Sequence, residues 1–207
     1  MSQGLRGSGA KNKNVFEDCN IKKAIITANT DGYEVTLKKS PRVEYQESMF
    51  SDTIDVSMVV VNSGSRVRGK NLMEGLPLVG TEDFTLAIED GMGNIIESEL
   101  IVNKVTPLEK TTQRETILIE LTSEQFIRNE ERSAAITKRY DGKISEHIRK
   151  ILTDNLKIPE DELDIEPTSN NYNFVGNTRK PFYTINWLCK KGIPSVDGKR
   201  GDSAGYI

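Results

Sequence analysis

The chain has 207 residues, of which 36% are hydrophobic and 29% are charged, and its formal net charge is -3. This length holds one large domain or two small ones with enough interior for a hydrophobic core. No apolar run approaches the ~20 residues that span a bilayer, and the interspersed charges lack the basic excess typical of nucleic-acid-binding proteins. A membrane-inserted protein and a protein that grips nucleic acid are therefore both disfavoured.

Residues 1–17 are rich in Gly, Ser, Asn and Lys and lack the apolar centre of a secretory leader, so we expect a flexible N-terminal arm. Two cysteines, Cys19 and Cys189, lie too far apart in the sequence to form a disulfide framework or a zinc site, which needs about four clustered ligands. We expect reduced thiols in a protein made in the cytoplasm of its host, with Cys189 packed in or near a core.

Residues 18–122 show the period-2 alternation of β-strands, for example in Tyr33, Val35 and Leu37. Similar alternation is found in Phe84, Leu86 and Ile88, and in Ile117, Ile119 and Leu121. The pattern predicts seven strands: 21–27, 33–38, 42–47, 53–61, 82–89, 94–105 and 112–122. Helices inside 33–61 or 82–121 would contradict this interpretation.

Turn residues separate these strands. The segments 29–32 and 90–94 contain the Asn, Asp and Gly residues that tolerate positive φ, so each predicts a hairpin loop. Further breaks are expected at 40–41, 62–65 and 106–107. Short connections of this kind predict an antiparallel sheet that closes into a barrel or packs as a sandwich, and the pattern does not choose between the two.

After residue 122 the hydrophobic period becomes helical, which predicts an α+β segment over 123–207. Thr122 and Gln125 form a capping-box pattern that predicts a short helix over 123–130. Residues 143–156 form an amphipathic pattern with one apolar stripe. A third helix is expected to begin at Pro181, to bury one face and to end before Gly192. That face consists of Phe182, Ile185, Leu188 and Cys189.

Groups able to perform chemistry are few. His147 is the only histidine, and its charged neighbours predict a dispensable residue on a helix surface. The acids of 160–166 lack the glycine and terminal Glu of a calcium loop, and we interpret them as a solvated turn that follows Pro159. A basic loop at Arg66, Arg68 and Lys70 is interpreted as solvated. We therefore predict no catalytic, cofactor-binding or metal-binding residues, and a protein that is not an enzyme.

Aromatic residues are sparse. Trp187 is the single tryptophan and Tyr183 precedes it by four residues on the predicted helix, which favours packing over a stacking platform. Tyr172 lies among Asn170, Asn171 and Asn173, the one combination that could bind sugars. A carbohydrate-binding β-domain of a phage or cell surface therefore remains an alternative, and a small hydrolase is a weaker one because a single histidine must supply its base.

Three segments resemble the baseplate hub proteins of T4-like contractile-tailed phages, particularly marine ones. They are LPLVGTE at 76–82, which leads into the strand 83–89, NEERSAAITKRYDGKISEHIRKIL at 129–152, and PTSNNYNFVGNTRKPFYTINWLCKKGIPS at 167–195. The first resembles the entry to a strand of the hub's tube-like barrel, and the second resembles the link from that barrel to an inserted helix. The likeness covers residues 20–207.

This resemblance implies a structural virion protein that joins the tail tube to the central spike and forms part of the DNA channel. Hubs of this family form trimers in which each subunit contributes two tube-like barrels, giving a pseudo-sixfold ring. The implied partners are further copies of the chain, the tail tube, the spike and the baseplate wedge, with DNA passing through the lumen without specific binding. No cofactor is implied. The location implied is the tail baseplate of the virion.

The sequence departs from that plan in length. Residues 18–122 account for one barrel, and 123–207 resemble the start of a second, incomplete one, so we expect a fragment or a split subunit. A closed ring removes the free edges of an antiparallel sheet, which agrees with such a role. A mildly acidic lumen also repels the phosphates of passing DNA.

Overall fold

The computed structural model of the chain describes residues 20–37, 40, 42–48, 51–63, 67–90, 92–111 and 114–195. Seven antiparallel strands form one sheet in the order β2-β1-β5-β6-β7-β4-β3. The strands are β1 (Asn20–Thr27), β2 (Glu34–Thr36), β3 (Arg42–Gln46), β4 (Asp55–Ser63), β5 (Asp83–Glu89), β6 (Ile95–Lys110) and β7 (Arg114–Thr122). All seven predicted strands are confirmed, with ends shifted by a few residues.

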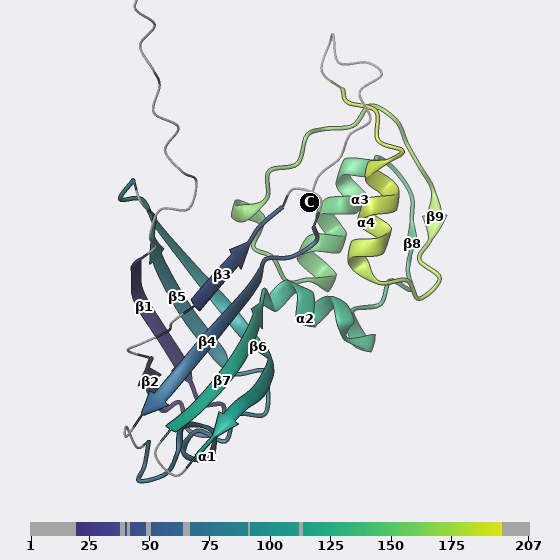
Figure 1. Cartoon of the computed structure of the whole chain (residues 1–207). Helices are drawn as coiled ribbons and strands as arrows, with labels where there is room; N and C mark the ends of the chain where they lie inside the picture. The colour runs from purple at the N-terminus through teal and green to yellow at the C-terminus, as the bar shows by residue number, and fades with distance from the viewer. Residues whose placement is uncertain are drawn as a thin grey trace, which may run out of the picture.

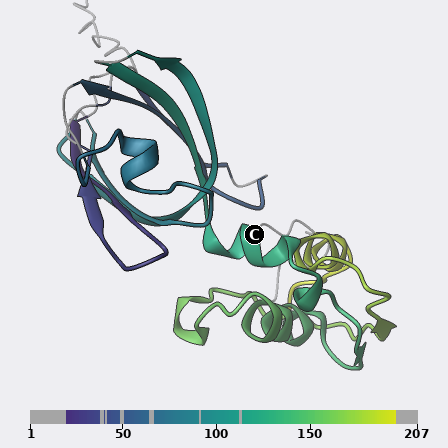
Figure 2. The same ribbon diagram turned by 90° about the horizontal axis from the view of Figure 1, so that it is seen from below.

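The sheet rolls around its own core, as Figures 1 and 2 show. No ladder joins β2 to β3 among the described residues, so the sheet is open. The prediction of a closed barrel or a two-sheet sandwich was therefore wrong in both forms. Both edge strands are short, and a three-residue β2 cannot provide the continuous ladder that closure requires.

Strand β6 is longer than predicted, because Thr106 and Pro107 lie within it and do not end it. Beyond Val102 the strand no longer pairs with β5 or with the residues just before it, and it pairs with β7. Pro107 has no N–H to donate. A proline is tolerated in this part of β6 because the strand has a neighbour on one side only, so a missing donor need not break a ladder. The register also shifts between Pro107 and Glu109, which accommodates the ring.

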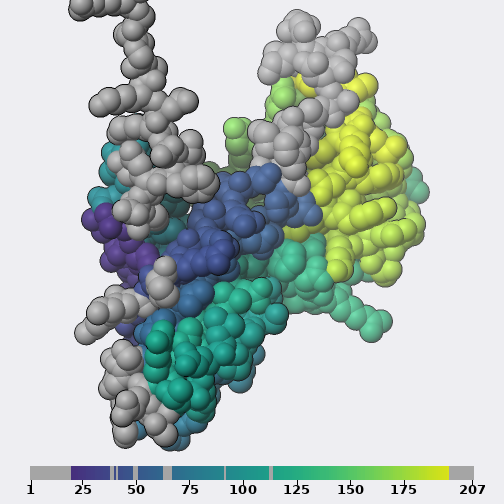
Figure 3. Space-filling view, viewed as in Figure 1, coloured from purple at the N-terminus to yellow at the C-terminus, as the bar shows by residue number. Residues whose placement is uncertain are grey.

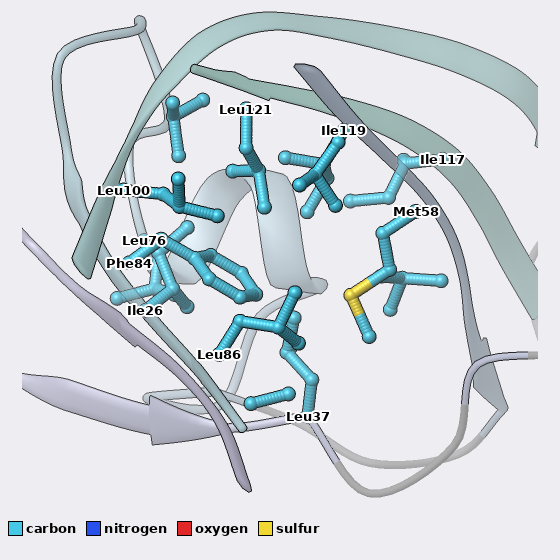
Figure 4. Packing of buried hydrophobic residues seen from close by; sticks show 14 of the residues in the cluster. Ile26, Leu37, Met58, Leu76, Phe84, Leu86, Leu100, Ile117, Ile119 and Leu121 are labelled. Atoms are coloured by element: carbon cyan, nitrogen blue, oxygen red, sulfur yellow. The ribbon is translucent and has the colours of Figure 1, made fainter. Parts of the chain in front are cut away.

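Buried side chains of five strands, β1, β4, β5, β6 and β7, fill the rolled sheet, and a short helix, α1 (Leu72–Gly75), packs against this core at one end of the sheet (Figures 1 and 2). Leu76, at the end of α1, is fully buried next to Phe84 of β5, and Figure 4 shows both within the cluster. The sequence pattern does not predict α1. Its four residues are too few to show a helical period.

The remaining described residues form a helical part beside the sheet (Figure 1). Its helices are α2 (Glu124–Glu130), α3 (Ile144–Lys150), which continues as a π-helical turn (Ile151–Asn155), and α4 (Pro181–Cys189). Two 3-10 turns (Arg132–Ala134 and Glu160–Glu162) and the small ladder of β8 (Arg139–Tyr140) with β9 (Phe174–Val175) complete it. The three predicted helices are confirmed.

The start of α2 differs from the predicted capping box. Thr122 is the last residue of β7, and the N-cap is Ser123, whose Oγ accepts a hydrogen bond from the backbone N–H of Phe126 at 3.3 Å. The strand therefore ends at the predicted residue, and Ser123 performs the capping that the sequence pattern assigned to Thr122.

A second hydrophobic cluster holds the helical part together. Its fully buried members include Ile144, Ile151, Ile185 and Leu188. The two hydrophobic clusters divide close to residue 122, where the hydrophobic period changes. A boundary between two domains at that residue stays a prediction. The predicted arm, 1–17, and the end of the chain from 196 lie outside the described residues.

Gly176 packs against the backbone of Ile136. A substitution at Gly176 therefore tests the packing of the helical part. A Cβ at Gly176 would lie 2.3 Å from the carbonyl oxygen of Ile136, too close for any real contact. We expect Gly176→Ala to lower the free energy of unfolding by about 3 kcal/mol, the upper part of the overpacking range. The matched control is Gly192→Ala, whose new Cβ would lie 3.4 Å from the nearest side-chain carbon of Thr168. Equal urea midpoints for the two variants would contradict the prediction.

Candidate assembly surface

The residues considered for chemistry form no catalytic arrangement in the described structure. Among the described residues, no group of three or more His, Cys, Asp or Glu side chains is placed to share a metal ion. No described helix is long and apolar enough to cross a membrane. The Cys189 thiol is half-buried, as predicted, and burial raises its pKa, which makes the nucleophilic thiolate scarcer.

His147 is not on the surface, so that prediction was wrong. Its side chain is 1% exposed, and its Nε2 lies 2.9 Å from the carbonyl oxygen of Tyr172, which fixes Nε2 as the donor. The ring packs edge-on against Tyr140 and Phe174. The helical spacing already indicated burial of His147, because His147 follows Ile144 by three residues and so lies on the buried stripe. Its charged neighbours lie on other faces of the helix.

The expectation that His147 is dispensable therefore changes to an expectation of lost stability. We expect His147→Ala to lower the free energy of unfolding by about 2–4 kcal/mol, because it opens a cavity and leaves the Tyr172 carbonyl without its donor. Thermal unfolding followed by circular dichroism measures the effect. Lys150→Ala, an exposed change on the same helix, is the control and should leave the melting temperature unchanged. A parent-like melting temperature for His147→Ala would contradict the burial.

The asparagine-rich segment is used in packing. Asn170 donates to the carbonyl oxygen of Lys191 at 2.9 Å and accepts from the backbone N–H of Ile193 at 3.0 Å. Asn173 accepts from the N–H of Gly142 at 3.1 Å. These side-chain amides are already hydrogen-bonded to backbone groups of the protein. Most of the polar groups that a sugar site in this segment would need are therefore engaged.

Of the predicted pair Tyr183 and Trp187 on α4, only Trp187 packs as predicted. Its ring lies edge-on to Tyr172 and Phe174, at 5.2 and 5.6 Å between centroids. Tyr183 is 56% exposed, so its predicted packing was wrong. A separation of four residues advances about 400° around a helix, so the two residues lie some 40° apart, enough to separate a buried from an exposed position at the edge of the apolar face.

The acids are solvated, as predicted, and so are Arg68 and Lys70, the described residues of the basic loop. Glu160, Asp161, Glu162, Asp164 and Glu166 are all exposed, and the first three form the 3-10 turn after Pro159. In the basic loop, Arg68 is paired with Asp31 and lies over the ring of Tyr33, 4.3 Å from its centroid. The hydrogen bond from Arg68 holds the pKa of Asp31 below its usual value. Arg66 lies outside the described residues.

Two buried carboxylates, those of Glu82 and Glu115, were not predicted from the sequence. Glu82 is 1% exposed and accepts hydrogen bonds from the backbone N–H groups of Val79 and Gly80 at 2.7 and 3.0 Å. Glu115 is 3% exposed and accepts from the N–H of Leu72, at the start of α1, at 3.0 Å. Counting back by twos from Ile117 reaches Glu115, so the strand period already predicted an inward carboxylate.

The edges of the sheet and its exposed apolar side chains are the features best suited to assembly. On the outer sides of β2 and β3, no described strand pairs with the backbone. The β5–β6 hairpin exposes Met92, Ile95 and Ile96, which are 85%, 62% and 44% exposed. Unpaired edges and exposed apolar side chains both mark surfaces that other chains can cover.

An open groove of about 450 Å³ lies where the sheet meets the helical part. Ile54 and Thr53 line it from the sheet side, and Ile158 and Phe182 line it from the helical side. Next to it, Asn186 of α4 donates to Asp52 Oδ1 at 2.7 Å. Figure 3 shows the segment before β4, in blue, against α4, in yellow. The groove contains no paired acid and base that could perform catalysis.

The fold is similar to that of a solved prophage tail protein. A 43 kDa tail protein of prophage MuSo2 from Shewanella oneidensis aligns with a TM-score of 0.54 and 12% identity, over 83% of this chain and 50% of that one. Mainly antiparallel β-structure with the fold of a phage tail protein is therefore shown. No protein-family model and no curated protein sequence matches the chain.

Two further solved structures align less closely. A tail protein from Neisseria meningitidis aligns with a TM-score of 0.48 and 9% identity, over 84% of this chain and 46% of that one. An E. coli component of the type VI secretion system, itself similar to T4 tail proteins gp27 and gp5, aligns with a TM-score of 0.47 and 8% identity, over 84% and 43%. The chain spans about half the length of the solved structures it matches.

Proposed function

We propose that this chain is a structural subunit of a phage tail, and within the tail a baseplate hub protein that joins the tail tube to the central spike. The observation that carries the proposal is the rolled seven-stranded sheet followed by a helical part, an arrangement that aligns with a prophage tail protein over 83% of the chain. The three segments that resemble hub proteins lie on the entry to β5, on the α2–α3 region and on the β9–α4 region.

The geometry of the surface supports assembly over catalysis. The buried polar groups Glu82, Glu115 and His147 hold backbone in place, and none of them lines the junction groove. The two free sheet edges offer backbone donors and acceptors to a neighbouring strand, which is how antiparallel sheets extend between chains. The proposed subunit is therefore not an enzyme, uses no cofactor and acts through its contacts.

The proposed assembly is a trimeric ring of this chain in the virion baseplate, between the tail tube, the spike and the baseplate wedge. Residues 18–122 would form the tube-like domain, and 123–207 the helical segment with the start of a second tube-like domain. DNA would pass through the lumen without specific binding, in agreement with the net charge of -3.

Mass in solution tests the proposed ring. We expect sedimentation equilibrium to give the mass of three chains of 23.2 kDa each, independent of loading concentration above the dissociation constant. Labelled antibody against the purified protein should bind at the baseplate end of isolated tails in electron micrographs. A monomer that binds immobilised glycans and leaves tails unlabelled would overturn the proposal in favour of a carbohydrate-binding domain.

A further inference from the structure

One end of the helical part carries a surplus of positive charge. We name the basic end the surface formed by Arg132, Lys138, Arg139, Arg179 and Lys180, all of them exposed. Backbone pairing brings the segments of Lys138 and Arg139 and of Arg179 and Lys180 together: Ile136 bridges to Arg179, the N–H of Gly176 donates to the carbonyl oxygen of Lys138, and Arg139 pairs with Val175. The arrangement is therefore part of the fold and does not depend on one flexible segment.

Three of the five cations have no local counterion. Arg139 is paired with Asp141 at 2.8 Å, and Lys180 is paired with Glu130. Arg132, Lys138 and Arg179 form no ion pair with any residue that the structure describes. Setting the carboxylates Glu130, Glu131 and Asp141 against the five cations leaves a surplus of two positive charges for a partner.

Exposed apolar groups accompany these charges. Tyr183 and Val175 are 56% and 51% exposed, and the guanidinium of Arg179 lies over the Tyr183 ring at 5.1 Å from its centroid. Tyr and Arg dominate the energetic centres of protein interfaces, because each combines a large contact area with directed polar groups. An exposed pair of this kind is typical of a surface that another protein covers.

A tight turn presents this surface rigidly. The N–H of Arg179 donates to the carbonyl oxygen of Gly176 at 3.1 Å, and the two residues between them, Asn177 and Thr178, have φ of 49° and 56°. Both therefore adopt the left-handed conformation of a type I′ turn, which β-branched threonine normally avoids. Such strain is kept only where the surroundings enforce it, and here the N–H of Thr178 is held by the carbonyl oxygen of Ile136 at 2.9 Å.

The opposite end of the helical part carries the opposite charge. We name the acidic turn the exposed residues Glu160, Asp161, Glu162 and Asp164. Glu160 is paired with Arg149 at 3.5 Å, and the other three form no ion pair within the described structure. In Figures 1 and 2 the acidic turn, in light green, lies on the side toward the sheet, whereas β8, β9 and the tight turn lie on the far side.

We infer that the basic end of one copy docks on the acidic turn of a second copy. Both surfaces are present on every chain, they are complementary in charge, and they lie at opposite ends, so the contact is head-to-tail. A head-to-tail contact repeated by rotation closes into a ring. This inference rests on the proposed function, because it names the surfaces through which the helical parts of a ring-forming subunit meet.

Charge reversal tests the contact on the full chain by sedimentation velocity. The first variant carries Lys138→Glu and Arg179→Glu, the second carries Asp161→Lys and Glu162→Lys, and a third combines all four changes. We expect each of the first two to weaken self-association at least tenfold. We expect the third to recover most of it, because its two ends are complementary again. Association of the parent should weaken as salt rises from about 0.1 to about 0.5 M.

The control reverses two exposed lysines outside both surfaces, Lys150→Glu and Lys190→Glu, and should leave association unchanged. Circular dichroism of every variant establishes that a loss of association is not a loss of folding. A parent ring that survives both reversals, or a combined variant that fails to recover, overturns this contact and leaves the proposed function standing. A parent that is monomeric at every concentration overturns both, and recovery of binding only with added DNA reassigns the basic end to nucleic acid.

Discussion

Replacing Phe182 by alanine should destabilise the helical part severely. The Phe182 side chain is 4% exposed and belongs to the cluster around Ile185 and Leu188. Its backbone N–H also donates to Oδ1 of the buried Asn129 at 2.9 Å, which ties the first turn of α4 to α2. Removing a buried phenylalanine side chain typically costs about 3–5 kcal/mol, a large share of a domain's ~5–15 kcal/mol.

The single tryptophan makes this effect local and measurable. Trp187 packs within the same cluster, so its fluorescence reports the helical part during urea unfolding. We expect the fluorescence midpoint of Phe182→Ala to fall well below that of the parent, and tails assembled with the variant to be incomplete in micrographs. Lys190→Ala, an exposed change just after α4, should match the parent. Equal midpoints for Phe182→Ala and the parent would mean that this face of α4 is not a core face.

Replacing Phe84 by alanine should produce a comparable loss in the rolled sheet. Phe84 is fully buried, pairs with Ile26 on one side and Leu100 on the other, and packs next to Leu76 (Figure 4). The cavity should again lower the free energy of unfolding by about 3–5 kcal/mol. Far-ultraviolet circular dichroism follows this change, because most of the strands belong to the sheet. Thr85→Ala, one residue along on the outward face, is the control.

Compared by both signals, the two phenylalanine variants also test the predicted boundary at residue 122. Two independent domains predict that Phe84→Ala moves the circular dichroism transition while leaving Trp187 fluorescence near its parent midpoint. A single cooperative unit predicts that each variant moves both transitions together. The second result would contradict the division into 18–122 and 123–207.

The strands were predictable because their signal is local. Alternation in Phe84, Leu86 and Ile88 sets one face inward wherever the strand lies in the sheet, and the hairpin at Asp90 is fixed by its own side chain, which accepts from the N–H of Asn94 at 2.8 Å. The helix at Pro181 was predictable for a similar reason, since a proline start and a glycine stop enclose its apolar stripe.

The open edges of the sheet and the burial of His147 were predicted wrongly because they depend on contacts distant in sequence. Whether β2 meets β3 is decided by the roll of all seven strands, which no short pattern encodes. The acceptor of His147 lies on Tyr172, 25 residues further along the chain. The charged neighbours of His147 led to the prediction of a surface position, although its spacing from Ile144 favoured a position in the interior.

Under the proposed function, the position of α1 at one end of the rolled sheet and the core beside it limit where a passage for DNA could run. Leu72 and Leu76 belong to the buried cluster that fills the sheet, so core side chains occupy the interior of the described sheet. Any conduit must then be enclosed by several copies, with the outer faces of strands as its wall. Its bore would be set by how many sheets surround the axis, and a change in subunit number would alter the diameter without altering the fold of any one chain.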